Sequence, residues 1–153
     1  MKTIDNIKII GVDAGYGNMK TANFCFRTGL TAYDTEPLFT KNMLVYEGRY
    51  YLIGEGHKTY TAEKTLDEDY YVLTLAAIAM ELNREQLTEA DVYLSAGLPL
   101  SWVLEQKDDY LAYLLKNQEV EFSFKGVRYK IRIVGADILP QGYAAIADKL
   151  DDL

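Results

Sequence analysis

The first third of the chain has the hydrophobic pattern of short strands joined by tight turns. Ile7 to Asp13 is a β-branched, nearly continuous apolar run, which is typical of a buried strand. A glycine-rich turn follows, and from Met19 to Phe26 apolar side chains recur at alternate positions, as in a returning strand. Residues 27–41 have the composition of a loop. Two short apolar runs at 42–46 and 49–53 flank Glu47-Gly48 and predict a second hairpin.

The remaining residues predict helices that alternate with strands. Asp67 or Asp69 could cap a helix that runs to about Asn83 and is apolar almost all round, so we expect it to be buried. Residues 91–97 read as a buried strand. A helix is predicted next, over 102–117, and its buried stripe is expected to consist of Leu104, Leu111, Leu114 and Leu115. A hairpin with arms 120–124 and 127–133 follows, and then a helix over 140–150.

The order of these elements predicts an α/β fold in which helices cover a mixed sheet. The composition agrees with a globular chain, since 49% of the 153 residues are hydrophobic and 25% are charged. The longest apolar stretch, Val72 to Met80, is far shorter than the roughly 20 residues that a membrane-spanning helix needs. With no signal peptide and a single cysteine, Cys25, we expect a cytoplasmic protein without disulfides.

Charge and ligand counts exclude several classes of function. Sixteen Lys and Arg against 23 Asp and Glu give a net charge of −7, which argues against direct nucleic-acid binding. One histidine, His57, and one cysteine are too few for a zinc or iron–sulfur site. Ser101 lacks the surroundings of a hydrolase nucleophile.

The segment Gly11 to Lys20 holds the clearest candidate chemistry. It matches neither the Walker A loop nor the Rossmann fingerprint. It does place an acidic residue, Asp13, at a strand end, then a glycine turn whose N–H groups can hold phosphate oxygens, and then Lys20. On the residues alone, an ordinary hairpin turn at Gly17-Asn18 explains the segment more simply.

Three motifs in order resemble the actin-like ATPases, and in particular the bacterial plasmid-segregation actins of the ParM type. They are Asp13-x-Gly15-x-Gly17-Asn18-x-Lys20, the turn Leu94 to Ser101, and the hairpin followed by Ile138 to Ile146. The resemblance covers about residues 7–150 and is weak between 31 and 64, a stretch that varies in the family. It implies an actin-like, ribonuclease H-like domain. We expect five strands in its sheet, with a three-strand antiparallel meander beside two parallel strands and helices on both faces.

The resemblance also implies a nucleotide site for ATP and Mg²⁺. Asp13 would hold the water shell of Mg²⁺, and Gly15, Tyr16, Gly17 and Asn18 would form the loop over the β- and γ-phosphates. Lys20 would contact the phosphates. Gln141 falls where the family positions the attacking water, although the residues alone favour a role at a helix N-terminus.

The family's second phosphate motif and its adenosine motif have no counterpart before Leu153. We therefore expect residues 1–153 to be the N-terminal half of a two-domain clamp, with the second domain absent and ATP bound weakly and hydrolysed little by this half alone. The complete protein would polymerise with ATP and segregate plasmid DNA through an adaptor protein. Tyrosines in the 31–64 region, among them Tyr33, Tyr46 and Tyr60, are hypothetical filament contacts.

Two other functions stay open. The chain could be half of a sugar or acetate kinase of the same superfamily, which would place a catalytic aspartate and a sugar pocket beyond Leu153. It could instead be a non-catalytic interaction domain that keeps the fold without the chemistry, in which case Asp13 and Lys20 would be dispensable.

Overall fold

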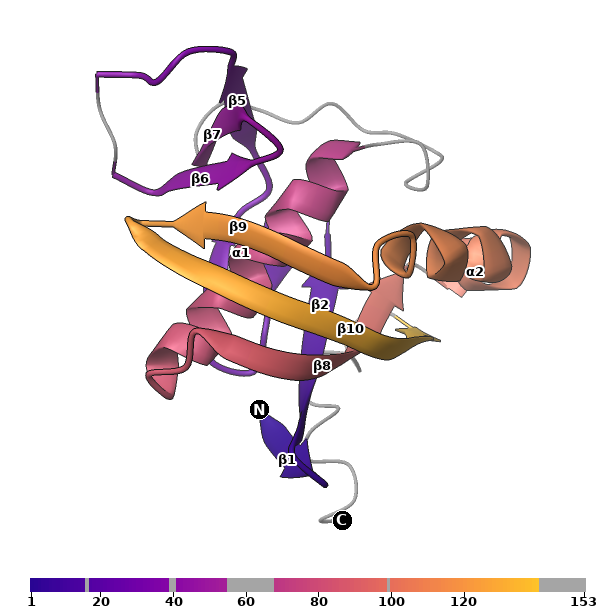
Figure 1. Ribbon diagram of the computed structural model, residues 1–153. Coiled ribbons are helices and arrows are strands. Elements are labelled where there is room, and N and C mark those ends of the chain that lie inside the picture. The colour runs from indigo at the N-terminus through magenta and orange to yellow at the C-terminus, as the bar shows by residue number, and fades with distance from the viewer. Residues whose placement is uncertain (16, 39–40, 55–67, 99, 141–153) are drawn as a thin grey trace.

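The described residues form one curled mixed sheet around a buried helix. The computed structural model describes residues 1–15, 17–38, 41–54, 68–98 and 100–140, and within them ten strands and two α-helices (Figure 1). The sheet order is β4-β3-β2-β8-β10-β9-β6-β7-β5, and β1 pairs with the first half of β2. The elements are β1 (Lys2–Ile4), β2 (Ile7–Ala14), β3 (Asn18–Lys20), β4 (Cys25–Arg27), β5 (Leu30–Tyr33), β6 (Met43–Tyr46), β7 (Arg49–Ile53), α1 (Glu68–Arg84), β8 (Glu89–Leu98), α2 (Leu100–Leu114), β9 (Glu119–Phe124) and β10 (Val127–Pro140).

Three parallel strands, β2, β8 and β10, occupy the centre of the sheet. Gly97 of β8 pairs with Asp13 of β2 on one side and with Leu139 of β10 on the other, so the three carboxyl ends meet at one edge. The expected sheet of five strands with two parallel ones is therefore too small. The β6–β7 hairpin joins the sheet through β9, and this long-range pairing leaves no trace in local periodicity.

Two local predictions for the first third of the chain are wrong. The predicted strand over 19–26 is broken into β3 and β4 by a turn, in which Thr21 N–H donates to the Phe24 carbonyl at 2.8 Å. The Thr21 hydroxyl also accepts from Phe24 N–H at 3.1 Å, so the threonine competes successfully with strand pairing. The predicted loop over 27–41 contains β5, which pairs with β7.

Both predicted hairpins with a glycine turn are confirmed. Glu47-Gly48 between β6 and β7 has φ values of 50° and 76°, and Lys125-Gly126 between β9 and β10 has 53° and 79°. Left-handed backbone at both turn positions matches the right-handed twist of the flanking strands. The last strand is longer than expected and reaches Pro140, so the helix predicted over 140–150 falls mainly on residues outside the described part.

Helix α1 is enclosed by the curl of the sheet. It contacts β2 and β3 near one end of the sheet order and β6 near the other. Figure 1 shows α1 running behind β9 and β10. The predicted all-round burial is confirmed, since every residue from Tyr70 to Ala79 is buried, and the buried Thr74 hydroxyl donates to the Tyr70 carbonyl at 2.8 Å.

Helix α2 packs against α1 and β10 through tyrosines. Tyr110, Tyr113 and Leu114 are buried, whereas Leu115 is exposed, so the predicted leucine stripe is only partly correct. Leu111 is partly buried, and the Leu104 side chain lies outside the described residues. The expectation of helices on both faces stays a prediction, because α1 and α2 contact each other and the helix predicted last is outside the described part.

A tyrosine cluster joins three elements: Tyr46 of β6, Tyr71 of α1, and Tyr113 with Tyr110 of α2. The Tyr71 ring centroid lies 5.8 Å from that of Tyr46 and 5.7 Å from that of Tyr113. The Lys116 ammonium is 4.3 Å from the centre of the Tyr71 ring, a cation–π contact. Asn117 Nδ2 donates to the Tyr46 hydroxyl at 2.9 Å, and burial raises the pKa of Tyr46. Tyr46 is therefore a core residue and not the filament contact considered above.

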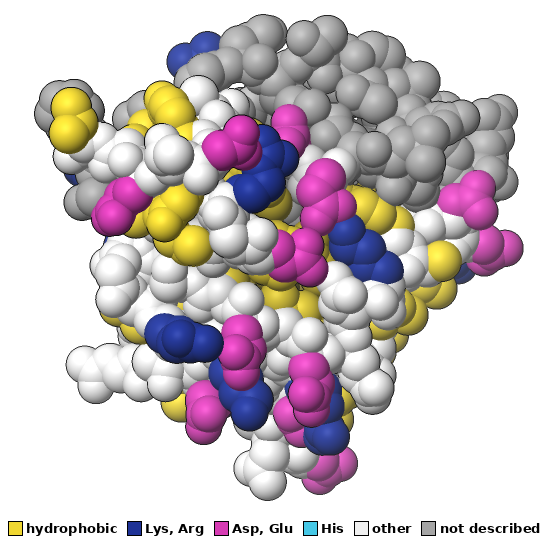
Figure 2. Space-filling model, turned by 45° about the horizontal axis from the view of Figure 1, so that its top comes forward, with side chains coloured by type: hydrophobic (Ala, Val, Ile, Leu, Met, Phe, Trp, Pro, Cys, Tyr) yellow, Lys and Arg dark blue, Asp and Glu magenta, His cyan; other side chains and the backbone are white. Residues whose placement is uncertain are grey.

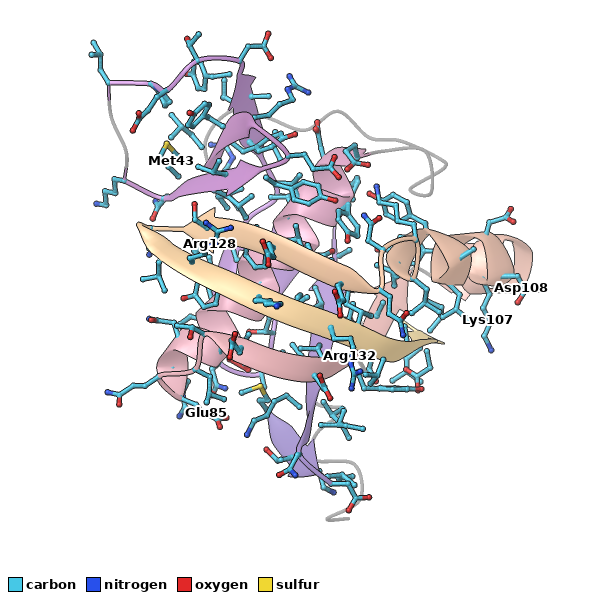
Figure 3. All side chains as sticks on the ribbon, viewed as in Figure 1. Met43, Glu85, Lys107, Asp108, Arg128 and Arg132 are labelled. Atoms are coloured by element: carbon cyan, nitrogen blue, oxygen red, sulfur yellow. The ribbon has the colours of Figure 1, made fainter. Side chains whose placement is uncertain are left out.

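No helix within the described ranges is long and apolar enough to cross a membrane. The face of the sheet opposite α1 carries cross-strand ion pairs, with Arg132 Nη2 2.7 Å from Asp91 Oδ2 and Arg128 Nη2 3.1 Å from Glu121 Oε2. Figure 3 shows both arginines on β10. These exposed pairs contribute little stability, but each places a carboxylate beside an arginine of β10.

A buried carboxylate connects α1 to the turn between β3 and β4, and its removal tests that connection. Glu81 is 2% exposed, and Asn23 Nδ2 donates to both its carboxylate oxygens, at 2.9 and 3.0 Å. Because hydrogen bonds to charged groups are worth about 1.5–3 kcal/mol, we expect Asn23→Ala to lower the free energy of unfolding by about 1.5 kcal/mol in urea denaturation. Asn83→Ala, at an exposed position of α1, is the control and should change it by less than about 0.5 kcal/mol. Equal effects of the two substitutions would contradict this account.

Candidate functional site

The candidate site lies where the carboxyl ends of the three parallel strands meet. Open α/β sheets bind ligands outside this edge. The register places Gly11, Ser95 and Asp137 in one row across β2, β8 and β10, and Asp13, Gly97 and Leu139 in the next. Because alternate residues share a face, the side chains of Asp13, Ser95 and Asp137 all lie on the same face of the sheet.

Asp13 and Lys20 are register partners in the antiparallel pair of β2 and β3. Asp13 is 4% exposed near the end of β2, and its register partner on β3 is Lys20, which is exposed. Directly opposite residues in such a pair have their Cβ atoms about 4.5–5.5 Å apart. The hydrophobic strand thus delivers a buried carboxylate to the edge, and the turn brings Lys20 back to the position opposite it.

The glycine turn between β2 and β3 is closed by its own backbone. Gly15 N–H donates to the Asn18 carbonyl at 3.1 Å, so this N–H is already used within the turn. Gly17 is exposed, and a Cβ added there would meet no atom within 4 Å. Asn18 begins β3 and pairs with Arg27, and Tyr16 lies outside the described residues. The open side of the turn is therefore at Gly17.

Thr28, which the sequence analysis missed, stabilises the turn through two hydrogen bonds. It is 2% exposed; its hydroxyl donates to the Gly15 carbonyl at 2.9 Å, and its N–H donates to the Gly17 carbonyl at 2.9 Å. Both bonds tie the carbonyls of the glycine loop to a buried residue. A threonine between Arg27 and Gly29 gives no local signal of this role, which depends on the pairing of β3 with β4.

Asp137 is the second carboxylate on the site face, and it too was missed. It is half-buried on β10, and its Oδ1 atom is buried without a hydrogen bond inside the described part of the chain. It lies in the row next to Asp13, two strand spacings across, which is about 10 Å. Sequence analysis missed Asp137 because a β-bulge between Ile133 and Gly135 shifts the alternation of inward and outward side chains along β10.

The remaining candidates stand as follows. Gln141 follows β10 directly but lies outside the described residues. Within the described ranges no three His, Cys, Asp or Glu side chains cluster closely enough to hold a metal ion by themselves. Figure 2 shows acidic and basic side chains interspersed on the visible surface.

Loss of the Thr28 hydroxyl should loosen the turn without displacing the sheet. Thr28→Val keeps the shape and the β-branched side chain but leaves the Gly15 carbonyl without its donor, at a cost of about 1–3 kcal/mol. We expect this loss in urea unfolding, while Thr35→Val, at an exposed position, should change stability by less than about 0.5 kcal/mol. If Thr28→Val were as stable as the parent chain, the turn would have to be held by its glycine backbone alone.

The fold matches solved bacterial and archaeal actin homologues. The chain is similar to the Alp12 filament structure, with 21% identity and a TM-score of 0.64 over 90% of this chain and 47% of that one. It is similar to the apo psk41 ParM protein with 15% identity and a TM-score of 0.69, over 90% of this chain and 50% of that one. It is similar to Bacillus thuringiensis ParM in the apo form with 14% identity and a TM-score of 0.69, over 91% of this chain and 47% of that one. That protein has also been solved with ATP. The chain spans about half the length of each of these proteins.

A comparison with curated protein sequences gave no match. The family described as the N-terminal domain of actin-like proteins matches residues 11–143, most of the chain. Together with the sheet topology and the position of the glycine turn, this match shows that the chain belongs to the family of actin-like protein N-terminal domains.

Proposed function

We propose that this chain is the nucleotide-binding N-terminal half of a ParM-like actin ATPase, which assembles into filaments with ATP and segregates plasmid DNA through an adaptor protein. The observation that carries the proposal is the buried Asp13 opposite the exposed Lys20, beside the open side of the turn at Gly17. The charge of the chain supports a DNA contact made by the adaptor, since the net charge is −7.

The proposed roles follow from the chemistry of each group. Asp13 would hold the water shell of a bound Mg²⁺ ion, and that ion would supply positive charge against the charge that develops during phosphoryl transfer. Gly17 lets the β- and γ-phosphates approach the backbone, and Lys20 supplies a point charge to them. Gly15, Tyr16 and Asn18 complete the loop. Asp137 and Gln141 are the candidates for orienting the attacking water.

A complete site needs groups from both sides of the nucleotide. Only one wall is formed by the described residues, and the solved relatives are about twice as long as this chain. We therefore propose that a second domain completes the clamp, and that the chain alone binds ATP weakly and hydrolyses little of it.

The proposed filament contact involves exposed apolar side chains near the edge strand β5. Tyr33 at the end of β5 is 37% exposed, and Leu38 in the loop that follows is 97% exposed. Large apolar side chains this exposed are typical of interaction sites when they cluster. Tyr60 belongs to the same hypothesis but lies outside the described residues.

The nucleotide site is tested in the full-length protein by Asp13→Asn. The substitution keeps the shape of the side chain and removes its charge, so we expect the rate of phosphate release from MgATP to fall on the order of 100-fold, the usual scale for losing one preorganised electrostatic group. Asp108→Asn, at an exposed position of α2 labelled in Figure 3, is the matched control and should leave the rate unchanged. Sedimentation with MgATP measures filament formation in the same samples.

Three results would contradict the proposal. Equal rates for Asp13→Asn and the parent protein would favour the non-catalytic interaction domain. Transfer of the γ-phosphate to a sugar or to acetate would favour the kinase. Full-length protein that neither hydrolyses ATP nor sediments with it would remove the ATPase filament altogether.

The filament contact is tested by the double substitution Tyr33→Ser and Leu38→Ser. If these side chains are buried between subunits, losing them should raise the critical concentration for assembly at least about tenfold, since a buried large apolar side chain is worth about 1.5–3 kcal/mol. Leu115→Ser, at an exposed position after α2, is the control. An unchanged critical concentration in the double variant would place the contact elsewhere.

A further inference from the structure

Tyr93 lies on the site face of the sheet, beside the second carboxylate. It belongs to β8 and precedes Ser95 by two positions, so both side chains lie on the face that carries Asp13. Its register partner on β10 is Gly135, and Asp137 is two positions further along that strand. Diagonal neighbours of this kind are within reach of an aromatic side chain.

The backbone of β10 makes room for the tyrosine ring. A Cβ added at Gly135 would stand 2.9 Å from Cε2 and 3.0 Å from Cδ2 of Tyr93, closer than such atoms approach one another. The bulge between Ile133 and Gly135 inserts one residue into β10, and this shift turns Asp137 toward the site face. The glycine and the bulge together place the Tyr93 ring and the Asp137 carboxylate on one face.

The two side chains interact through their polar atoms. Burial raises the pKa of Tyr93, and the charge of Asp137 and a hydrogen bond to its carboxylate raise it further. The register and the position of the ring against Gly135 put the Tyr93 side chain within reach of the Asp137 carboxylate. The Oδ1 atom of Asp137 is buried and makes no hydrogen bond to the described part of the chain.

We propose that Tyr93 is a positioning residue, whose hydroxyl holds one oxygen of Asp137 and so fixes the other, Oδ1, for the water that attacks the γ-phosphate of ATP. This inference rests on the proposed function. In that step the water oxygen bonds to the γ-phosphorus, and the bond from phosphorus to the bridging oxygen breaks. ADP leaves with the electron pair, and the proton of the water passes to the released phosphate. Asp137 orients the water and Tyr93 orients Asp137.

Tyr93→Phe in the full-length protein tests this role, because phenylalanine keeps the ring against Gly135 and removes only the hydroxyl. We expect kcat for ATP hydrolysis to fall about tenfold, on the scale of one hydrogen bond made to a charged group. The Kd for the non-hydrolysable analogue AMPPNP should stay at the parent value, since a positioning residue acts on the reacting water and not on nucleotide binding. The Tm should fall by no more than a few degrees, about the cost of one hydrogen bond. Tyr50→Phe on β7 is the control and should leave kcat unchanged.

A double-mutant cycle with Asp137→Asn separates positioning from a general structural effect. If Tyr93 acts through Asp137, adding Tyr93→Phe to Asp137→Asn should change kcat by less than about twofold. Unchanged kcat in Tyr93→Phe, equal losses of kcat and AMPPNP affinity, or additive effects in the double variant would each overturn the role of Tyr93. Parent protein without any ATP turnover would overturn the proposed function as well, and so the two failures are distinguishable.

Discussion

The burial of α1 on all sides is the constraint on which the rest of the structure depends. A helix that is apolar almost all round cannot lie on a flat sheet with one side in water. The sheet meets this requirement by curling, so that strands from both ends of its order reach the same helix. Phe24 before β4 and Phe124 at the end of β9 consequently line one small cleft over the second half of α1, together with Met80.

The curl also fixes where chemistry is possible. The strands at its centre are the parallel ones, and two buried polar residues, Asp13 and Ser95, lie near their carboxyl ends. Strand register places both side chains there. Their positions are therefore as rigid as the sheet. A phosphate-binding site needs this rigidity, because a site that is already ordered loses little entropy when the ligand binds.

Sequence reasoning was most successful where the signal is local. The strand at Ile7, the two glycine hairpins, the helix over 68–84 and the glycine turn after Asp13 each have their signal within a few residues, and the structure contains all of them. It failed where position depends on distant pairing. The three- and four-residue strands β4 and β5 are too short for periodicity to be visible, and Thr28 acquires its role only when β4 lies beside β3.

Asp137 and Tyr93 show the same limit within the site. The residues of β10 alternate cleanly up to Ile133, and extrapolating that alternation past the bulge would assign Asp137 to the wrong face. The bulge has no strong sequence signature except Gly135. A glycine is needed there because the Tyr93 ring on the neighbouring strand leaves no room for a Cβ. The motif resemblance could point to this segment, but only the register gives each side chain its direction.

The attachment of the outer strands has a consequence for how such proteins diverge. The segment 30–53 leaves the body of the sheet after Gly29 and returns at Gly54, and these two residues are joined by a hydrogen bond of 2.8 Å from Gly54 N–H to the Gly29 carbonyl. Entry and exit therefore share one point, and the inner side of the unit belongs to the core, since Leu44, Tyr46 and Tyr51 are buried. The outer side, which carries the exposed Tyr33 and Leu38, is under no such packing constraint. Substitutions can therefore accumulate on the outer side while the inner side chains keep the unit in place.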